Sequence, residues 1–118
     1  MLQADDGVIT QDDAERAVDW MRNNASRMAQ ERAERLYMEQ WIKTVKATLQ
    51  MEQQGVSAAA AEIVALASPK YMAALQAYRD AIKADETNRF LVAAAEAKID
   101  AWRSQESTRR SEGRATGT

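Results

Sequence analysis

Helix-breaking residues are sparse in this sequence and leave long uninterrupted segments between them. The four glycines lie at positions 7, 55, 113 and 117, and the only proline is Pro69. Alanine and long, unbranched side chains fill most of the remaining positions, and these residues lose little conformational freedom in a helix. No segment has the two-residue alternation or the β-branched enrichment of a strand. The sequence therefore predicts an all-α fold.

The breakers divide the chain into two long helices joined by a short one. We expect these helices over about 11–54, 57–68 and 69–112. Two long antiparallel helices with a short connecting helix form a helical hairpin, and at about 1.5 Å rise per residue that hairpin is elongated and resembles a coiled coil. We further expect one helical domain over 10–112, between a flexible acidic N-terminus over 1–9 and a disordered polar tail over 113–118.

Residues with known preferences for helix ends lie at the predicted boundaries. Thr10 and Ser57 are of the type that caps a helix N-terminus. Ser68 precedes Pro69, and proline is well tolerated at the first helical position because its missing N–H has no partner there. Gly55 can adopt the left-handed conformation that closes the first long helix.

The apolar face of the first long helix turns along its length. The stripe that begins at Ala14 becomes charged beyond residue 30, and a second apolar stripe starts on another side of the helix. Either the helix bends near residues 30–36, or a partner covers the second stripe. We expect partner binding through the residues of that stripe, which are Met38, Trp41, Ile42, Val45 and Leu49.

A coiled-coil spacing runs through the second long helix. Its positions are Tyr78, Ala81, Asp85, Asn88, Val92, Ala95, Ile99 and Trp102. Asp85 and Asn88 thus fall at core positions, where a polar residue lowers stability but can fix the register. Antiparallel pairing brings Asp85 and Arg89 level with Arg35 and Glu39. These charges either form a layer inside the hairpin or face solvent beside the seam.

The chain carries more large apolar side chains than one hairpin can cover. Three tryptophans and six methionines occur in 118 residues. We expect a homodimer, formed as a four-helix bundle from two hairpins. A further protein partner, either a DNA-processing protein or a host protein, is also expected to bind either this apolar stripe or the arginines near the C-terminus.

Several function classes lack the residues they require. Without cysteine or histidine the chain has no thiolate nucleophile, no usual general base near neutral pH and no usual zinc ligand. It has no glycine-rich phosphate loop and no nucleophile motif. We therefore expect no catalytic residues, no cofactor, no metal and no enzymatic activity. The acidic start is unlike a signal peptide, and no apolar run reaches about 18 residues, so we expect a cytoplasmic protein without membrane contact.

Basic residues on the first helix and near the C-terminus could contact phosphates. They are Arg32, Arg35, Lys43, Lys46, Arg109, Arg110 and Arg114. Against nucleic-acid binding, the net charge is -2 and glutamates alternate with these residues, as on an ordinary solvated helix face. Weak single-strand binding, with Trp41 or Trp102 stacking on bases, remains an alternative function.

Four segments carry a resemblance to a known family. They are the segments 33–40, 43–47, 68–71 and 93–107. Over about 14–110 the chain resembles small, uncharacterised all-helical proteins of tailed phages and prophages, whose genes lie among early recombination and replication genes. The resemblance implies an accessory factor for phage DNA recombination or replication in the host cytoplasm. The acidic N-terminal segment supports an alternative, inhibition of a host nuclease or defence complex, because acidic surfaces fit basic nucleic-acid grooves.

Overall fold

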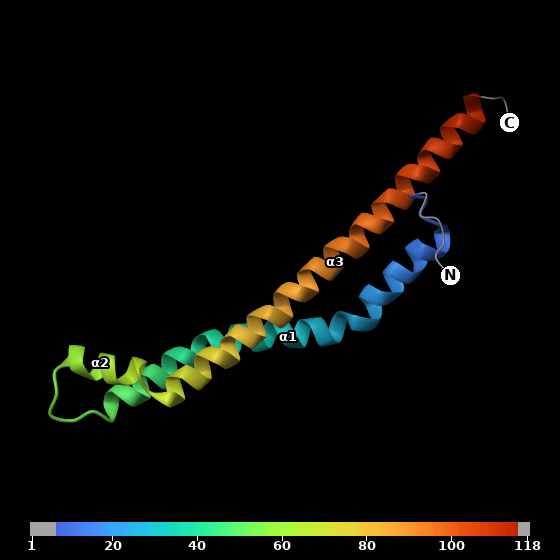
Figure 1. Cartoon of the computed structure of the whole chain (residues 1–118). Coiled ribbons are helices and arrows are strands. Elements are labelled where there is room, and N and C mark those ends of the chain that lie inside the picture. The colour runs from blue at the N-terminus through green and yellow to red at the C-terminus, as the bar shows by residue number, and fades with distance from the viewer. Residues whose placement is uncertain (1–6, 116–118) are drawn as a thin grey trace, which may run out of the picture. The chain divides into compact units, whose positions relative to one another are not determined.

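The computed structural model describes residues 7–115, which form three helices (Figure 1). Helix α1 spans Gln11–Met51, α2 spans Ala58–Leu66 and α3 spans Pro69–Ala115. None of the described residues is in a strand. The predicted all-α fold, with two long helices joined by a short one, is confirmed. Residues 1–6 of the predicted flexible N-terminus and residues 116–118 of the predicted tail lie outside the described residues.

The two long helices contribute to two compact units. The first unit combines the start of α1, up to Ala25, with α3 from Arg89 onward. The second unit, Ser26–Asn88, holds the rest of α1, all of α2 and the start of α3. Within each unit the α1 segment is antiparallel to the α3 segment, as a hairpin requires.

All three predicted helix starts are confirmed. The Thr10 hydroxyl accepts a hydrogen bond from the Asp13 backbone N–H at 3.0 Å, and the Thr10 backbone N–H donates to the Asp13 carboxylate at 3.0 Å. This reciprocal pair is a capping box. The Ser57 hydroxyl accepts from the Ala60 N–H at 3.1 Å. The Ser68 hydroxyl accepts from the Lys70 N–H at 3.3 Å, and α3 begins at Pro69.

The end of α1 differs from the prediction. Helix α1 stops at Met51, three residues before the expected end. Gly55 has the expected left-handed conformation, with φ of 75°, but it lies in the loop between α1 and α2 and does not close α1 directly. The last turn closes instead through a 3.1 Å hydrogen bond from the Gln53 N–H to the Gln50 carbonyl.

Both ends of the described chain have defined contacts or helical structure. The Gln105 side chain accepts a hydrogen bond from the Ile9 N–H and donates one to the Gly7 carbonyl, both at 3.0 Å. These bonds attach residues 7–9, predicted to be flexible, to α3 within the first unit. Helix α3 continues through Gly113 to Ala115, into the segment predicted to be disordered.

The predicted seam of α3 is confirmed in both units. All eight of its residues are buried or half-buried, including the polar pair Asp85 and Asn88. The core is nevertheless made of small side chains. Among the described residues the buried hydrophobic side chains are those of Leu49 and seven alanines: Ala14, Ala17, Ala61, Ala65, Ala74, Ala81 and Ala95.

Candidate functional site

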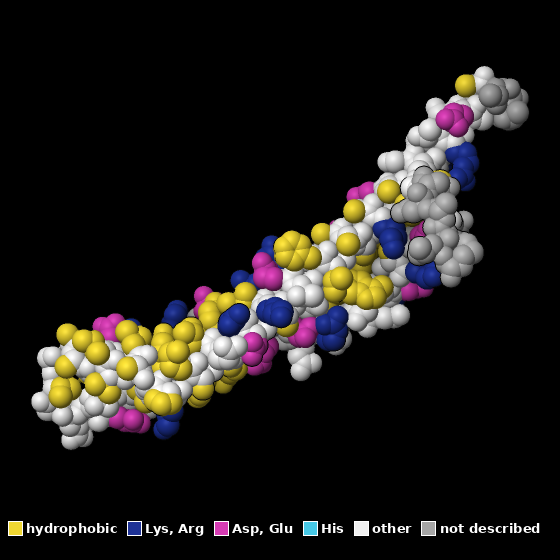
Figure 2. Space-filling model, viewed as in Figure 1, with side chains coloured by type: hydrophobic (Ala, Val, Ile, Leu, Met, Phe, Trp, Pro, Cys, Tyr) yellow, Lys and Arg dark blue, Asp and Glu magenta, His cyan; other side chains and the backbone are white. Residues whose placement is uncertain are grey.

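Large apolar side chains are concentrated on the surface of the second unit. Figure 2 shows hydrophobic atoms gathered over α2 and the adjoining parts of α1 and α3. The exposed large apolar residues of this unit are Leu36, Tyr37, Trp41, Met51, Val56, Ile63, Val64, Leu66, Met72 and Leu75. Exposed apolar surface on this scale is typical of a protein interaction site.

An apolar groove of about 450 Å³ lies between α1 and α3 in the second unit. From α1 it is lined by Trp41, Thr44, Val45, Thr48, Leu49 and Glu52, and from α3 by Lys70, Ala73, Ala74 and Ala77. Apart from Lys70, the α3 side has only methyl groups opposite the larger α1 side chains, and this difference in size leaves the space open. The Thr44 hydroxyl is hydrogen-bonded to the Gln40 carbonyl of its own helix at 3.4 Å.

Two aromatic rings stand at one end of the groove. Tyr37 and Trp41 are one helical turn apart on α1, and their rings stack with centroids 6.4 Å apart and planes 10° apart. The Tyr37 side chain is 60% exposed and Trp41 is 42% exposed. The pair is therefore an exposed aromatic projection next to the alanines that α3 contributes to the groove.

Helix α2 contacts α1 outside the groove. Lys46 of α1 forms an ion pair with Glu62 of α2, with 3.0 Å between Nζ and Oε1. Around α1, at about 100° per residue, Lys46 is roughly 160° from both Thr44 and Thr48 but only about 60° from Leu49, and all three of these residues line the groove. No residue of α2 lines the groove. Within the described chain the groove is thus open to solvent.

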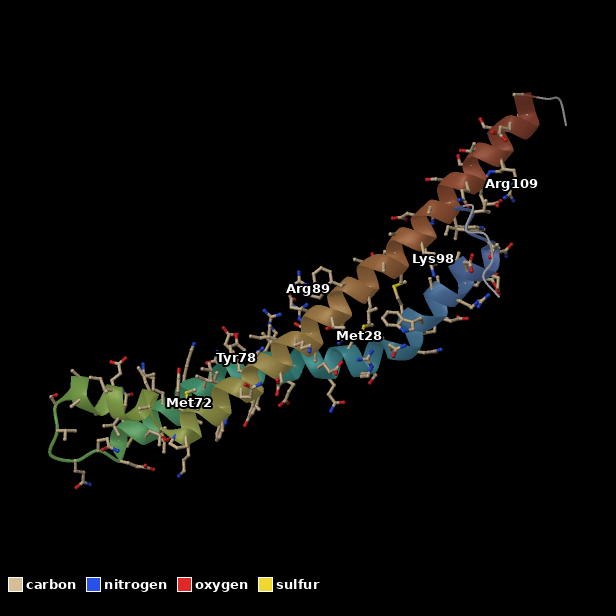
Figure 3. The ribbon with its side chains drawn as sticks, viewed as in Figure 1. Met28, Met72, Tyr78, Arg89, Lys98 and Arg109 are labelled. Carbon is tan, nitrogen blue, oxygen red and sulfur yellow. The ribbon has the colours of Figure 1, made fainter. Side chains whose placement is uncertain are left out.

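A second apolar hollow, of about 480 Å³, is formed by α3 alone. Met72, Leu75, Tyr78 and Ile82 supply its apolar lining, and Met72 and Tyr78 are labelled on this part of α3 in Figure 3. Gln76 and Arg79 complete its lining. This hollow has no facing wall from another helix, whereas the groove has one wall from α1 and one from α3.

The five predicted partner-binding residues have different environments. Trp41 is exposed, Val45 is half-buried and Leu49 is 7% exposed, and these three line the groove. Met38 and Ile42 are half-buried and do not line it. Leu49 belongs to the core of the second unit as well as to the groove wall. The predicted stripe therefore faces partly inward, toward α3.

A layer of polar side chains crosses the second unit beyond the groove. Asp85, only 7% exposed, accepts a hydrogen bond from Arg35, which also contacts Glu86 at 3.2 Å. The Arg35–Asp85 distance is 3.1 Å between Nη1 and Oδ2. The alternative in which these charges all face solvent is wrong for Asp85. Glu39, expected level with this layer, is exposed, and Arg89, also exposed, belongs to the first unit.

Asn88 extends the same layer by one turn of α3. Its side chain is 5% exposed, accepts a hydrogen bond from Arg27 at 3.1 Å and donates one to Glu31 at 2.8 Å. Both polar groups of the buried amide are thus satisfied by α1. A buried polar side chain with all its partners fixes how two helices align.

The neighbouring carboxylates stabilise the charged form of Arg35. The hydrogen bond to Asp85 raises the pKa of the Arg35 guanidinium above its ordinary value, and the nearby charge of Glu86 acts in the same direction. Arg35 therefore remains charged at neutral pH. Its role here is to pair with carboxylates of its own chain.

The predicted phosphate-contacting residues are divided between the two units. In the second unit Arg35 pairs with Asp85 and Lys46 pairs with Glu62, whereas Arg32 and Lys43 are exposed. In the first unit Arg109 pairs with Glu106 at 2.8 Å, and Arg110 and Arg114 are exposed. The structure thus assigns three of the seven basic side chains to contacts within the chain.

Sequence reasoning missed the alanine floor of the groove. Lys70, Ala73, Ala74 and Ala77 follow the i, i+3, i+4, i+7 spacing of one helix face, so the signal is present in the sequence. It also missed the hydrogen bonds that Asn88 forms with Arg27 and Glu31, because Asn88 is far from both residues in the sequence. The sequence around Gln105 does not indicate the contact of this residue with residues 7–9.

Within residues 7–115 no cluster of acidic side chains has the grouping that a metal ion requires, and no helix has a stretch apolar and long enough to cross a membrane. Comparison with known proteins gives no matching family model, no matching curated protein and no matching solved structure. The resemblance to helical phage proteins therefore remains a prediction from the sequence.

Proposed function

We propose that this chain is a non-enzymatic, helical protein–protein interaction module that binds through the apolar surface of its second unit. One observation carries the proposal. Among the described residues Leu49 is the only buried hydrophobic side chain larger than alanine, whereas ten large apolar residues of this unit are exposed. A stable fold ordinarily buries its largest apolar side chains, so this distribution favours a surface completed by a partner.

The partner best suited to this surface is an apolar helix. The groove has an elongated apolar lining with one acidic residue, Glu52, and one basic residue, Lys70. An amphipathic helix inserts apolar side chains into such a groove at one-turn intervals. Helical association can be with a second copy of the chain, with a DNA-processing protein or with a host protein.

For the biological context of this binding, we propose an accessory role in phage DNA recombination or replication. It rests on the sequence resemblance given above. The alternative is inhibition of a host nuclease or defence complex, which is also a binding function. In that case the acidic N-terminal residues, and not the groove, would form the binding surface.

Direct nucleic-acid binding is less well supported. Residues 26–88 hold eight basic and eight acidic side chains and therefore have no net charge. Arg35 and Lys46, two of the candidate phosphate contacts, form ion pairs with Asp85 and Glu62. Nucleic-acid affinity comes largely from neutralising phosphates with uncommitted cations, so a neutral unit is a poor candidate.

The test compares Trp41→Ala with Phe90→Ala in affinity purification from cells that express the tagged chain. Both variants remove an exposed aromatic ring, but Phe90 lies in the first unit. We expect proteins held by the wild type to be held by Phe90→Ala and lost from Trp41→Ala. A purified partner should then bind Trp41→Ala at least about tenfold more weakly. Equal binding to both variants would contradict the proposal.

A further inference from the structure

We propose that the α1–α3 groove of the second unit binds an amphipathic helix of another protein, and that the apolar stripe of this helix ends in one acidic and one basic side chain. The acidic side chain of the partner lies beside Lys70, and the basic side chain lies beside Glu52. This inference rests on the proposed interaction function, because it concerns the same groove. It adds the conformation of the bound segment and the charges by which that segment is recognised.

The walls of the groove favour a helix over an extended peptide. Apart from Glu52, every lining residue lies within α1 or α3, and the backbone groups of a helix are paired with each other except at its ends. An extended peptide placed against such walls would bury N–H and C=O groups without partners, which is costly. A helix pairs its own backbone groups and presents only side chains to the groove.

The two ends of the groove differ in chemistry. Along α1 the lining begins at Trp41 and ends at Glu52, about 17 Å away at 1.5 Å rise per residue. The alanines of α3 occupy the middle, where large apolar side chains of a partner helix, spaced at one-turn intervals, can fill the space. Lys70 lies with Glu52 at the end opposite Trp41. The bound helix is therefore apolar at its centre and meets two charges at one end.

These two charges are unpaired within the described chain. Neither the Glu52 carboxylate nor the Lys70 ammonium group forms a hydrogen bond or an ion pair inside residues 7–115, although both line the same groove. By contrast, Lys46 of the same unit is paired with Glu62 of α2 at 3.0 Å. Both groups at the groove are thus free to pair with opposite charges from a partner.

Both charges also have the sign that the adjoining helix end disfavours. A helix carries partial negative charge at its C-terminus and partial positive charge at its N-terminus. Glu52 directly follows the last residue of α1, and Lys70 is the second residue of α3. The other ends of the same helices have the favourable sign, with Asp12 and Asp13 in the first turn of α1 and Arg114 in the last turn of α3. Departure from a local rule at the groove is expected of functional residues, and a partner with opposite charges relieves it.

The test uses two synthetic helical peptides of about 18 residues, a length at which an isolated helix can be stable. Both have leucines in the i, i+3, i+4, i+7 spacing of one helix face. The charged peptide has one glutamate and one lysine at each end of this stripe, so that either direction of binding presents them. In the neutral peptide these four residues are glutamines.

Binding to the full-length chain is measured by fluorescence anisotropy, and the binding site by NMR of the alanine methyl groups. We expect the charged peptide to shift the methyl signals of Ala73, Ala74 and Ala77. It should bind about fivefold more tightly than the neutral peptide, because exposed ion pairs contribute modestly to affinity.

Lys70→Glu should weaken binding of the charged peptide by about tenfold and leave binding of the neutral peptide nearly unchanged. Folding should be preserved, because Lys70 is exposed and a glutamate has the favourable sign in the first turn of α3. Lys43→Glu is the matched control, since Lys43 is an exposed lysine of the same unit that does not line the groove. This variant should bind both peptides like the wild type. Circular dichroism should show equal helix content in both variants.

A third peptide tests the conformation of the bound segment. It has the leucines and charges of the charged peptide, but a central residue outside the stripe is proline, which breaks the helix. This peptide should leave the methyl signals of Ala73, Ala74 and Ala77 unchanged. Binding as tight as that of the charged peptide would overturn a helical partner in favour of an extended one.

The remaining outcomes separate this inference from the proposed function. Unchanged methyl signals with either leucine peptide, equal affinities for the charged and neutral peptides, or equal effects of Lys70→Glu and Lys43→Glu would each overturn it. Shifts of the same signals on concentrating the wild type alone would identify a second copy as the occupant and would also overturn it. The proposed function would survive these results if Trp41→Ala still lost its protein in the affinity purification.

Discussion

Arg35 of α1 and Asp85 of α3 are joined across the second unit by a hydrogen-bonded ion pair of 3.1 Å, and Asp85 is almost completely buried. This pair selects one alignment of the two helices. A shift of one residue would turn Asp85 by about 100° around α3 and leave both charges without this contact. Because a buried carboxylate without a partner is costly, other alignments are strongly disfavoured.

Replacing Asp85 with alanine should destabilise the second unit. The change removes the buried acceptor of Arg35 and leaves a small cavity at a seam position, so we expect a loss of about 1–3 kcal/mol in the free energy of unfolding. Urea denaturation followed by circular dichroism measures it. Asp80→Ala on the same helix removes an exposed carboxylate bonded only to Gln76 in the preceding turn, and it should change stability by less than about 0.5 kcal/mol. Equal losses for both variants would contradict a special role for Asp85.

Thr10→Ala should weaken the start of α1 in a pH-dependent way. The hydrogen bond from the Thr10 backbone N–H lowers the pKa of Asp13 below its ordinary value of 3.8, and the Thr10 hydroxyl contributes in the same direction. A carboxyl with a lowered folded-state pKa stabilises the fold above its unfolded pKa, and this contribution disappears as the pH falls through the folded pKa. Thr10→Ala loses the cap at neutral pH, worth about 1 kcal/mol.

The measurement for this prediction is stability against pH for the wild type, Thr10→Ala and Asp13→Asn. As the pH falls below 3.8, the wild type should lose more stability than Asp13→Asn, and Thr10→Ala should lose an intermediate amount, because it keeps the backbone N–H at position 10 but lacks the hydroxyl. Glu15→Gln, which changes an exposed carboxyl in the same helical turn, is the control and should follow the wild type. Parallel curves for the wild type and Asp13→Asn would exclude the capping box as the source of the pH dependence.

Local rules predicted most of the fold, because the signals lie within one or two helical turns. Ser57, Ser68 and Pro69 marked helix starts correctly, and the seven-residue spacing placed Asp85 in the seam. Contacts between segments that are distant in the sequence were harder to predict. The amide of Gln105 reaches residues 7–9, about a hundred positions away, and nothing in its neighbourhood in the sequence indicates this.

The candidate site was predicted in part for the same reason. The large residues Trp41, Val45 and Leu49 form a visible stripe, but the groove also needs a floor of small side chains on α3. Alanines are frequent throughout this chain, so Ala73, Ala74 and Ala77 do not stand out until the two helices are aligned. The alignment itself depends on the Arg35–Asp85 pair.

Gln105→Ala should release residues 7–9 from α3. The substitution removes the acceptor of the Ile9 N–H and the donor to the Gly7 carbonyl, both at 3.0 Å. One hydrogen bond of ordinary strength slows exchange of its amide by about tenfold. We expect the Ile9 amide to exchange about tenfold faster in Gln105→Ala, as measured by hydrogen exchange. Gln76→Ala, which removes a side chain bonded only to Asp80, should leave the Ile9 rate unchanged.

Gly55→Ala should destabilise the loop between α1 and α2, because Gly55 has a φ of 75° that an alanine adopts at a cost of about 1 kcal/mol. No atom lies within 4 Å of the position that a Cβ would occupy, so the expected loss comes from backbone conformation and not from a clash. Gly55→Asn should lose less stability, because asparagine tolerates the left-handed region better than alanine does.

Gly113→Ala is the contrasting substitution, because Gly113 lies inside α3 without a positive φ. Alanine is a better helix former than glycine at such a position. Thermal unfolding should therefore show a lowered midpoint for Gly55→Ala, a smaller decrease for Gly55→Asn and no decrease for Gly113→Ala. A Gly55→Ala protein as stable as the wild type would mean that the loop adopts another conformation in solution.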